Sequence, residues 1–273
     1  MSNFVSRLTC SLLFVIAGAG AAFAQGAAPP DVLKELAPTG KLRAAINLGN
    51  AVLAQKGPDG APKGITVDLS RELARRAGVP VELVPFEAAG KVFEALKSGD
   101  ADLAFIAIEP VRAAELEFSP PYVLIEGGYM VHKDSPLKAV EDVDRAGIRI
   151  AVGLNSAYDL FLTRTIKNAT IVRAHTGGGS AMIELFLKDK LDVVAGVKPV
   201  LVTYAKTNPD MRVMDGRFMV IQQAMGVPKG RLAAARYVRS FVEDVKASGF
   251  AADALKRSNQ TDASVAPPDR AGG

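Results

Sequence analysis

The chain has 273 residues, of which 49% are hydrophobic and 23% charged, and its formal net charge is +4. This composition excludes a wholly disordered chain, and so small a charge excess argues against a dedicated nucleic-acid binder. The two histidines and one cysteine are too few for a His/Cys metal site of the usual kind, so we expect neither a metal nor a cofactor.

The first segment, residues 1–24, has the three regions of a secretory signal peptide. Arg7 precedes an apolar run, and the run ends at Ala22-Phe23-Ala24, which offers small residues for cleavage. An uncleaved membrane anchor is the alternative, but the run is short and has no charged stop-transfer flank. We therefore predict a cleaved signal peptide and a periplasmic protein, with a short Ala/Pro linker at 25–30.

Beyond the linker, apolar runs alternate with amphipathic segments, which predicts alternating strands and helices. In the first half we predict strands at 41–48, 81–86 and 101–108 and helices at 64–78 and 91–99. The nearly continuous apolar run at 101–108 is typical of a parallel strand covered on both faces. This order of elements implies a parallel sheet with helical crossovers.

The helix predicted at 64–78 is the clearest of these elements. Its apolar residues follow a helical period, and Glu72 and Arg76 have the spacing of an ion pair along a helix. Gly78 is the expected C-cap because glycine readily adopts the left-handed conformation.

After a longer apolar segment at 122–133, the scheme begins again. We predict strands at 148–153, 169–175 and 191–197, and helices at 156–168, 179–190 and 198–207. A strand at 217–227 and a long helix at 230–249 complete the series. The apolar face of that helix comprises Leu232, Tyr237, Val238, Phe241, Val242 and Val245.

Two successive α/β units of similar size predict two lobes joined by two crossing segments. We place lobe 1 at 31–126 and 224–257, lobe 2 at 127–223, and a flexible tail at 258–273. The expected hinge residues are Gly127, Gly128 and Val220. In open α/β sheets ligands bind at the carboxyl ends of the strands, which places a ligand cleft between the lobes.

Several short motifs follow one another in a characteristic order. They are Gly40-Lys41-Leu42-Arg43, Gly64 to Leu69, Leu96 to Gly99 with Asp102, Arg112 with Phe118 to Tyr122, Ala151 to Gly153, and Leu191 to Val194. In these motifs the chain resembles the bacterial extracellular solute-binding proteins of family 3, over roughly Leu33 to Leu255. The resemblance implies the type II periplasmic-binding-protein fold, in which two α/β lobes close on a ligand.

The resemblance also implies a carboxylate site. By its spacing, Arg112 corresponds to the arginine that holds the α-carboxylate of an amino acid in this family. Ser156, with Ala157 beside it, corresponds to the start of the lobe 2 helix that assists. A guanidinium fork matches a carboxylate, and the N–H groups at a helix N-terminus favour an anion.

The chain departs from the family pattern at the other end of such a ligand. The stretch between Asp102 and Arg112 is two residues shorter, and Glu109 stands where a threonine is expected. The aspartate that holds the ammonium corresponds to Val197, and no aromatic residue follows the first strand, which runs into Asn47. We expect Glu109 and Asn47 to contact the ligand, and an amino acid to lack its ammonium partner unless Glu109 supplies one.

Ordinary structural roles compete with these assignments. Arg112 could instead form a surface ion pair with Glu115 or Glu117. Ser156 could simply cap a helix, and Asn47 could simply form a turn. Neither His132 nor His175 is near a recognisable nucleophile motif, so we predict structural roles for both.

The function expected from these residues is capture of a small anionic solute for the permease subunits of an ABC importer. The protein would be a monomer that binds no nucleic acid and catalyses no reaction. Two alternatives remain. One is an exported dehydratase of the cyclohexadienyl type, with Glu109 as general acid beside Arg112. The other is an interaction protein that kept the fold and lost the ligand site.

Overall fold

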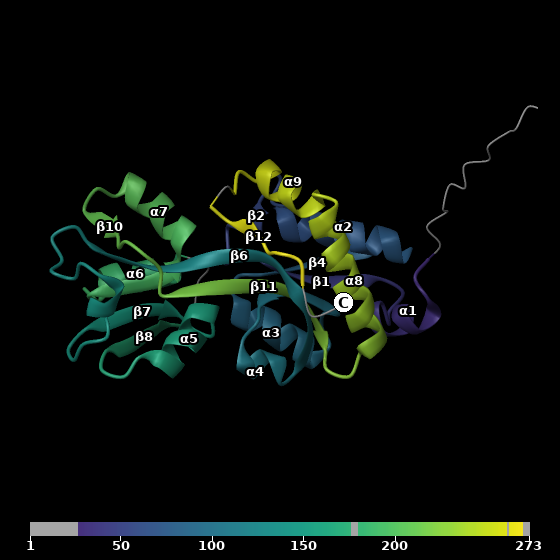
Figure 1. Cartoon of the computed structure of the whole chain (residues 1–273), viewed down its shortest axis with the longest axis horizontal. Helices are drawn as coiled ribbons and strands as arrows, with labels where there is room; N and C mark the ends of the chain where they lie inside the picture. Colours follow the sequence, from purple (N-terminus) through teal and green to yellow (C-terminus); the bar gives the residue numbers. More distant parts are fainter. Residues whose placement is uncertain (1–26, 176–179, 261, 270–273) are drawn as a thin grey trace, which may run out of the picture.

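The computed structural model describes residues 27–175, 180–260 and 262–269. The predicted signal peptide lies outside these residues. The described chain forms a ten-stranded mixed sheet and a separate two-stranded hairpin. Figure 1 shows the sheet continuing from one lobe to the other, with strands β6 and β11 running between them.

Lobe 1 is built on three parallel strands in the order β4-β1-β5. Its elements are α1 (Pro30–Leu36), β1 (Leu42–Asn47), β2 (Gln55–Lys56), β3 (Pro62–Lys63), α2 (Ile65–Ala77), β4 (Val81–Phe86), α3 (Ala89–Ser98), β5 (Leu103–Ala107) and α4 (Pro110–Ala113). The strand predicted at 81–86 is confirmed to the residue. Helix α1 was not predicted; it begins at the last residue of the predicted linker, since proline is favoured in a first helical turn.

Helix α2 agrees with the sequence in its buried face, its ion pair and its cap. Its apolar stripe is buried, and Arg76 Nε lies 2.8 Å from Glu72 Oε1. Gly78 has a φ of 75°, and its N–H donates to carbonyls of the last turn. A side chain at Gly78 would be strained in this conformation, which is why the helix ends on glycine.

Two long antiparallel strands, β6 (Leu116–His132) and β11 (Met219–Pro228), connect the lobes. Strand β11 also pairs with β5 in lobe 1, and β6 also pairs with β9 in lobe 2. The sequence predicted β6 to begin only at 122, because prolines interrupt the earlier part. The structure places that part in the strand through a register shift, where the Met225 N–H donates to Ser119 Oγ at 3.0 Å.

Lobe 2 repeats the scheme with three parallel strands in the order β9-β7-β8. Its elements are the 3-10 turn Val140–Asp142, β7 (Arg149–Gly153), α5 (Ala157–Thr165), β8 (Thr170–Ala174), α6 (Ala181–Lys188), β9 (Val193–Val197), α7 (Lys198–Thr207) and β10 (Met211–Val213). The helix predicted at 198–207 is confirmed to the residue. Helix α5 ends at Thr165, before the predicted end at 168, because Ile166 has extended backbone angles.

The C-terminal part of the chain returns to lobe 1 as α8 (Leu232–Ala247), α9 (Phe250–Arg257) and β12 (Ser264–Val265). Strand β12 pairs with β6, and the Ala266 N–H donates to the Tyr122 carbonyl at 3.0 Å. The tail predicted at 258–273 thus contains a short edge strand, β12, which its small and polar composition did not indicate. Leu232 is 53% exposed and does not join the buried face of α8, because it is the first residue of the helix.

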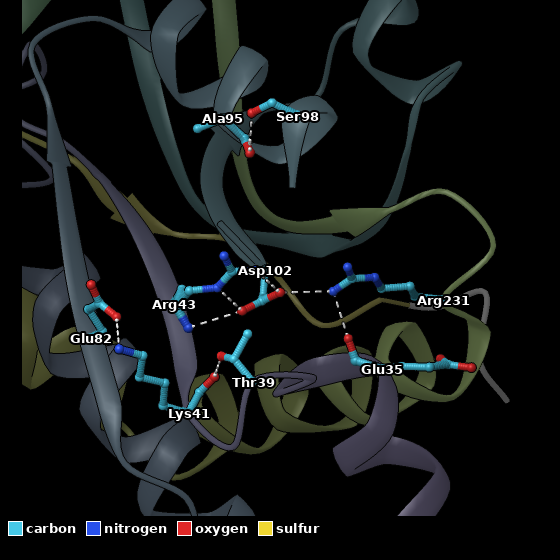
Figure 2. Close-up of polar contacts among 9 residues, drawn as sticks. All are labelled: Glu35, Thr39, Lys41, Arg43, Glu82, Ala95, Ser98, Asp102 and Arg231. Carbon is cyan, nitrogen blue, oxygen red and sulfur yellow. Dashed lines mark hydrogen bonds and ion pairs between the residues drawn. The ribbon is translucent and has the colours of Figure 1, made fainter. Parts of the chain in front are cut away.

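The same arginine–aspartate contact closes the far end of each parallel sheet. In lobe 1 (Figure 2) Arg43 Nε and Nη2 donate to the Asp102 carboxylate at 2.8 and 2.9 Å. In lobe 2 Arg149 Nε donates to Asp192 at 3.2 Å. Each arginine is the first or second residue of its lobe's first parallel strand, and each aspartate directly precedes the third. Both contacts therefore lie at the amino ends of the strands, away from the cleft.

The two contacts differ in their surroundings. The Asp102 side chain is fully buried and also accepts a bond from Arg231 Nη1 at 3.1 Å, while the Asp192 side chain is 38% exposed. Arg231 in turn donates to the Glu35 carbonyl at 2.7 Å, which ties α1 and the start of α8 to the sheet (Figure 2). The Asp102 carboxylate raises the pKa of the Arg43 guanidinium above its ordinary value, chiefly through their hydrogen bond.

Candidate functional site

A cleft lies between the carboxyl ends of the parallel strands of the two lobes. The empty space in it is about 730 Å³, a volume that includes the part open to solvent. The polar and charged side chains that line it come from both lobes: Asn47, Asn50, Glu87, Arg112, Ser156, Tyr158, His175 and Gln223.

Arg112 is the buried cation of this cleft. It lies on α4 directly after β5, and the residue is 1% exposed. Its Nη1 donates to the Ala107 carbonyl at 3.0 Å, and its Nη2 donates across the cleft to the Asn155 carbonyl at 2.8 Å. Burial lowers the pKa of this guanidinium to about 10, and the Glu109 charge opposes that shift. Arg112 is therefore a charged group at neutral pH, and a guanidinium has five N–H donors in all.

The start of helix α5 forms the facing wall. Ser156 is its N-cap, and Ser156 Oγ accepts from the Asp159 N–H at 3.0 Å. Asn155 has a φ of 58°, and its N–H donates to Asp159 Oδ2 at 2.8 Å. This turn directs the Asn155 carbonyl at Arg112. Ala157, the first helical residue, also lines the cleft.

Asn47 ends β1 and is 7% exposed. Its Oδ1 accepts from the Gly49 N–H at 3.0 Å, so it forms the local turn that the sequence offered as its structural role. It also lines the cleft, so the turn and a position beside a ligand are compatible.

Glu109 is not among the residues that line the cleft. Its side chain is 4% exposed, and Oε2 lies 2.6 Å from Nη1 of Arg164 on helix α5. This ion pair joins lobe 1 to lobe 2 beside the cleft. Val197 lies where the sequence placed it, at the end of β9, and forms an apolar part of the cleft wall.

Sequence reasoning missed several lining residues. His175 follows the edge strand β8 and lines the cleft, although it was predicted to be structural. Glu87 follows the edge strand β4 and forms a 3.2 Å ion pair with Lys56. Position at the end of a strand was the available signal for both. His132 does have a structural place, stacked on Phe186 with 4.9 Å between ring centroids.

Two further lining residues show how the wall is built. Tyr158 is 8% exposed, and its hydroxyl donates to Met182 Sδ at 3.6 Å. Burial raises the pKa of this phenol to about 12, so it is a neutral donor at physiological pH. Gln223 reaches the cleft from β11.

The three predicted hinge residues lie at the crossing or at its lobe 2 edge. Val220 pairs with Glu126 between the two lobes. Gly127 and Gly128 already pair with β9, so they belong to the lobe 2 sheet. A Cβ at Gly127 would lie 2.7 Å from Met219 Cγ, which gives this glycine a packing role in addition to any role in bending.

No group of three or more metal-ligating side chains occurs among residues 27–175, 180–260 and 262–269. Within the same described residues, no helix has both the length and the apolar character needed to span a membrane.

Two α/β lobes joined by two crossing strands, with a cleft between them, are the architecture known as the periplasmic-binding-protein fold. A model of the bacterial extracellular solute-binding proteins, family 3, matches residues 42–259. The chain belongs to this family, as its motifs predicted.

Among solved structures, ArgBP from T. maritima (P235GK mutant) has a TM-score of 0.71 at 22% identity, covering 84% of this chain and 99% of that one. AbpA from Streptococcus pneumoniae, bound to L-arginine, has a TM-score of 0.70 at 23% identity, covering 82% and 96%. The ancestral amino acid-binding protein AncCDT-1, a precursor of cyclohexadienyl dehydratase, has a TM-score of 0.69 at 24% identity, covering 82% and 98%. These likenesses confirm the predicted fold.

Among curated relatives, the amino-acid-binding protein AabA of Dichelobacter nodosus is 28% identical over 35% of this chain and 39% of its own length. The membrane-bound lytic murein transglycosylase F of Vibrio campbellii is 30% identical over 43% of this chain but only 22% of its own length. The octopine-binding periplasmic protein of Rhizobium meliloti is 26% identical over 69% of this chain and 60% of its own. The chain thus spans well under half the length of the first two relatives.

Proposed function

We propose that this protein captures a small anionic solute, an amino acid or another carboxylate, between its lobes and delivers it to the permease of an ABC importer. One observation carries the proposal: the buried guanidinium of Arg112 lies in the cleft between the lobes, opposite the N-terminus of α5. Both groups favour an anion, and the guanidinium matches the planar fork of a carboxylate. Relatives named for binding amino acids and octopine support a solute of this class.

The order of strands gives the cleft an inner and an outer end. Strands β5 and β9 lie beside the crossing pair, while β4 and β8 are the edge strands of the sheet. Ile106 and Val197, on the inner strands, are apolar, whereas Glu87 and His175 follow the edge strands. A ligand whose carboxylate meets Arg112 would therefore place its apolar part inward and any cationic group toward Glu87.

Val197 bears on whether the solute carries an α-ammonium. Valine offers neither a charge nor an acceptor, and a buried charge without its partner costs about 2–5 kcal/mol, roughly 30- to several-thousand-fold in affinity. We therefore expect simple carboxylates without an α-ammonium to compete well with the matching amino acids.

A thermal-shift screen of the mature protein against amino acids, their deaminated analogues, other carboxylates and sugars tests the proposal. A ligand at 100 to 1,000 times its Kd stabilises the protein by about 3–4 kcal/mol. Carboxylates are expected to raise the melting temperature, and sugars are not. Stabilisation by sugars alone, or by nothing in the screen, would contradict the proposal.

Val197→Asp is the matched variant for the ammonium. We expect it to improve the affinity of amino acids relative to their deaminated analogues by about tenfold or more, measured by calorimetry. Glu109→Gln and Glu87→Gln, measured with the same ligand pairs, report whether either acid already serves the ammonium. A wild type that strongly prefers amino acids, and keeps that preference in both variants, would contradict this account of the cleft.

Export is part of the proposal, because an importer receives its solute outside the inner membrane. Cleavage after Ala24 would leave Gln25 as the mature N-terminus and remove Cys10, the single cysteine of the chain. Mass spectrometry of the periplasmic protein is expected to find this N-terminus. Residues 1–24 on the periplasmic form would overturn the expectation.

The dehydratase and the ligand-free interaction protein are the alternatives. A dehydratase needs a general acid in the cleft; Glu109 is engaged by Arg164 outside it, whereas His175 and Glu87 line it. Turnover of a cyclic dienyl carboxylate that is lost in His175→Gln or Glu87→Gln would favour the enzyme. An interaction protein would bind none of the screened solutes.

A further inference from the structure

Three contacts join α3, α4 and the N-cap residue of α4 in lobe 1 to α5 and the turn before it in lobe 2. Glu109 Oε2 lies 2.6 Å from Arg164 Nη1, and Arg112 Nη2 donates to the Asn155 carbonyl at 2.8 Å. Gly90 lies so close that a Cβ there would be 2.9 Å from Asn155 Cβ. The two lobes therefore meet directly beside the cleft, through side-chain and backbone groups of the chain.

The first of these contacts is a close approach of opposite charges in which Glu109 Oε2 accepts no hydrogen bond, and one of its partners is buried. The Glu109 side chain is 4% exposed and the Arg164 side chain 41%. The Glu109 charge also acts on Arg112, whose pKa it supports against burial. Glu109 thus lies between two cations while the lobes are closed. Because Arg164 belongs to lobe 2, opening the cleft separates the pair and exposes Glu109 to water.

We propose that Glu109 and Arg164 are a pair of positioning residues that set the balance between open and closed lobes, and touch no ligand. This inference rests on the proposed function in so far as it concerns affinity. The apparent Kd of a site that exists only in the closed form is the intrinsic Kd divided by the closed fraction. Loss of the pair would therefore weaken every ligand by one common factor.

The test is a double-mutant cycle with Glu109→Gln, Arg164→Gln and the double variant, with Arg164→Lys as the conservative change. Lys41→Gln is the matched control, because it breaks an ion pair of the same 2.6 Å length that lies wholly within lobe 1. Closure is measured on the ligand-free proteins by small-angle X-ray scattering. Affinity is measured by calorimetry for at least two carboxylates of different size.

We expect both single variants and the double variant to raise the ligand-free radius of gyration to the same value. All three should weaken each carboxylate by a common factor of about three to ten. Arg164→Lys and Lys41→Gln should remain close to wild type. Since Arg164 is partly exposed, its variants report on the pair even where Glu109→Gln destabilises the buried site.

Two results would overturn the inference. One is an unchanged radius of gyration in Arg164→Gln. The other is a ligand-dependent loss of affinity in Glu109→Gln that Arg164→Gln does not share, which would make Glu109 a ligand contact. The scattering measurement needs no ligand. If the thermal-shift screen found no ligand, scattering would therefore still test the role of the Glu109–Arg164 pair.

Discussion

Arg112 owes its binding potential to the cleft that surrounds it. Two protein carbonyls, one from each lobe, already accept from its guanidinium, but neither carries a full charge. Glu109 supplies the nearby negative charge that opposes the effect of burial on the pKa of Arg112. A carboxylate in the cleft would give the Arg112 guanidinium both a charged partner and hydrogen-bond acceptors. The cost of removing this guanidinium from water has already been met on folding.

The variant Arg112→Lys tests this role. Lysine keeps the charge but loses the bidentate fork, so we expect the affinity for a carboxylate to fall about tenfold or more while the fold persists. Calorimetry measures the affinity and circular dichroism the fold. Arg257→Lys is the control, because Arg257 pairs with Asp68 on the surface at 2.8 Å. Equal affinities of both variants would reduce Arg112 to a structural residue.

For single residues, the sequence predicted the ends of strands more accurately than the directions of side chains. Val197 was placed correctly because it follows from the length of a buried apolar run. The direction of Glu109 depends on Arg164, which reaches it only when the lobes meet, and no local pattern encodes that contact. The residues before His175 in the sequence carry no binding motif. Its position at the cleft follows from the strand order of the sheet, which places β8 at the edge.

The two arginine–aspartate contacts at the amino ends of the sheets allow a matched comparison between elements. Asp102 is fully buried and bound by Arg43 and Arg231, whereas Asp192 is 38% exposed and bound by Arg149. Removing one partner of a buried pair leaves an uncompensated charge, but an exposed pair is screened by water.

We therefore expect Asp102→Asn to lower the free energy of unfolding by about 3–5 kcal/mol and Asp192→Asn by about 1 kcal/mol or less. Urea denaturation at pH 7 measures both. Since the two contacts share their place in the lobes, equal losses would mean that burial does not decide their strength.

Helix α2 carries a pH-dependent contribution to stability. Hydrogen bonds from Arg75 and then Arg76 lower the pKa of Glu72 from 4.5 to about 2. A carboxyl whose pKa is lower in the folded state stabilises the protein above its unfolded pKa, and this contribution is lost as the pH falls through the folded value.

We accordingly expect Glu72→Gln to cost about 1 kcal/mol at pH 7, as partly exposed pairs do. The difference from wild type should shrink as the pH falls from 4.5 toward 2, measured by urea denaturation at each pH. A difference that stays constant over that range would show that the charge of Glu72 is not its cause.

At the scale of elements, periodicity was sufficient for α2, β4 and α7. It was insufficient for β6 and β12, because both depend on pairing with distant strands. The first part of β6 contains prolines and is held through Ser119 and β11, and β12 is held by β6. The composition of a segment predicts only its own tendency to form a strand. These two segments are strands because of their pairing with other strands.

The last residues that the structure describes contribute to the stability of the whole molecule. Strand β12 lies on β6 beside the crossing, and Lys246 Nζ donates to the Pro267 carbonyl at 2.9 Å. We expect removal of residues 258–273 to lower the free energy of unfolding by about 2 kcal/mol, since it exposes apolar surface around Tyr122 and removes backbone hydrogen bonds.

Thermal unfolding of the truncated and full-length chains measures this loss. Removal of residues 270–273 alone is the control, because β12 and its contacts precede them. A stability unchanged by the longer truncation would restore the view of this segment as a flexible tail.

Lobe 2 is one continuous stretch of chain, whereas lobe 1 is assembled from two. The bond from Arg231 to Asp102 spans 129 positions, and the bond from Arg231 to the Glu35 carbonyl spans 196. Contacts so far apart in sequence form late, because a long loop must close before they stabilise anything. During synthesis from the N-terminus, lobe 1 is therefore begun first and completed last. Lobe 2 can fold before the C-terminal helices that complete lobe 1 have been made.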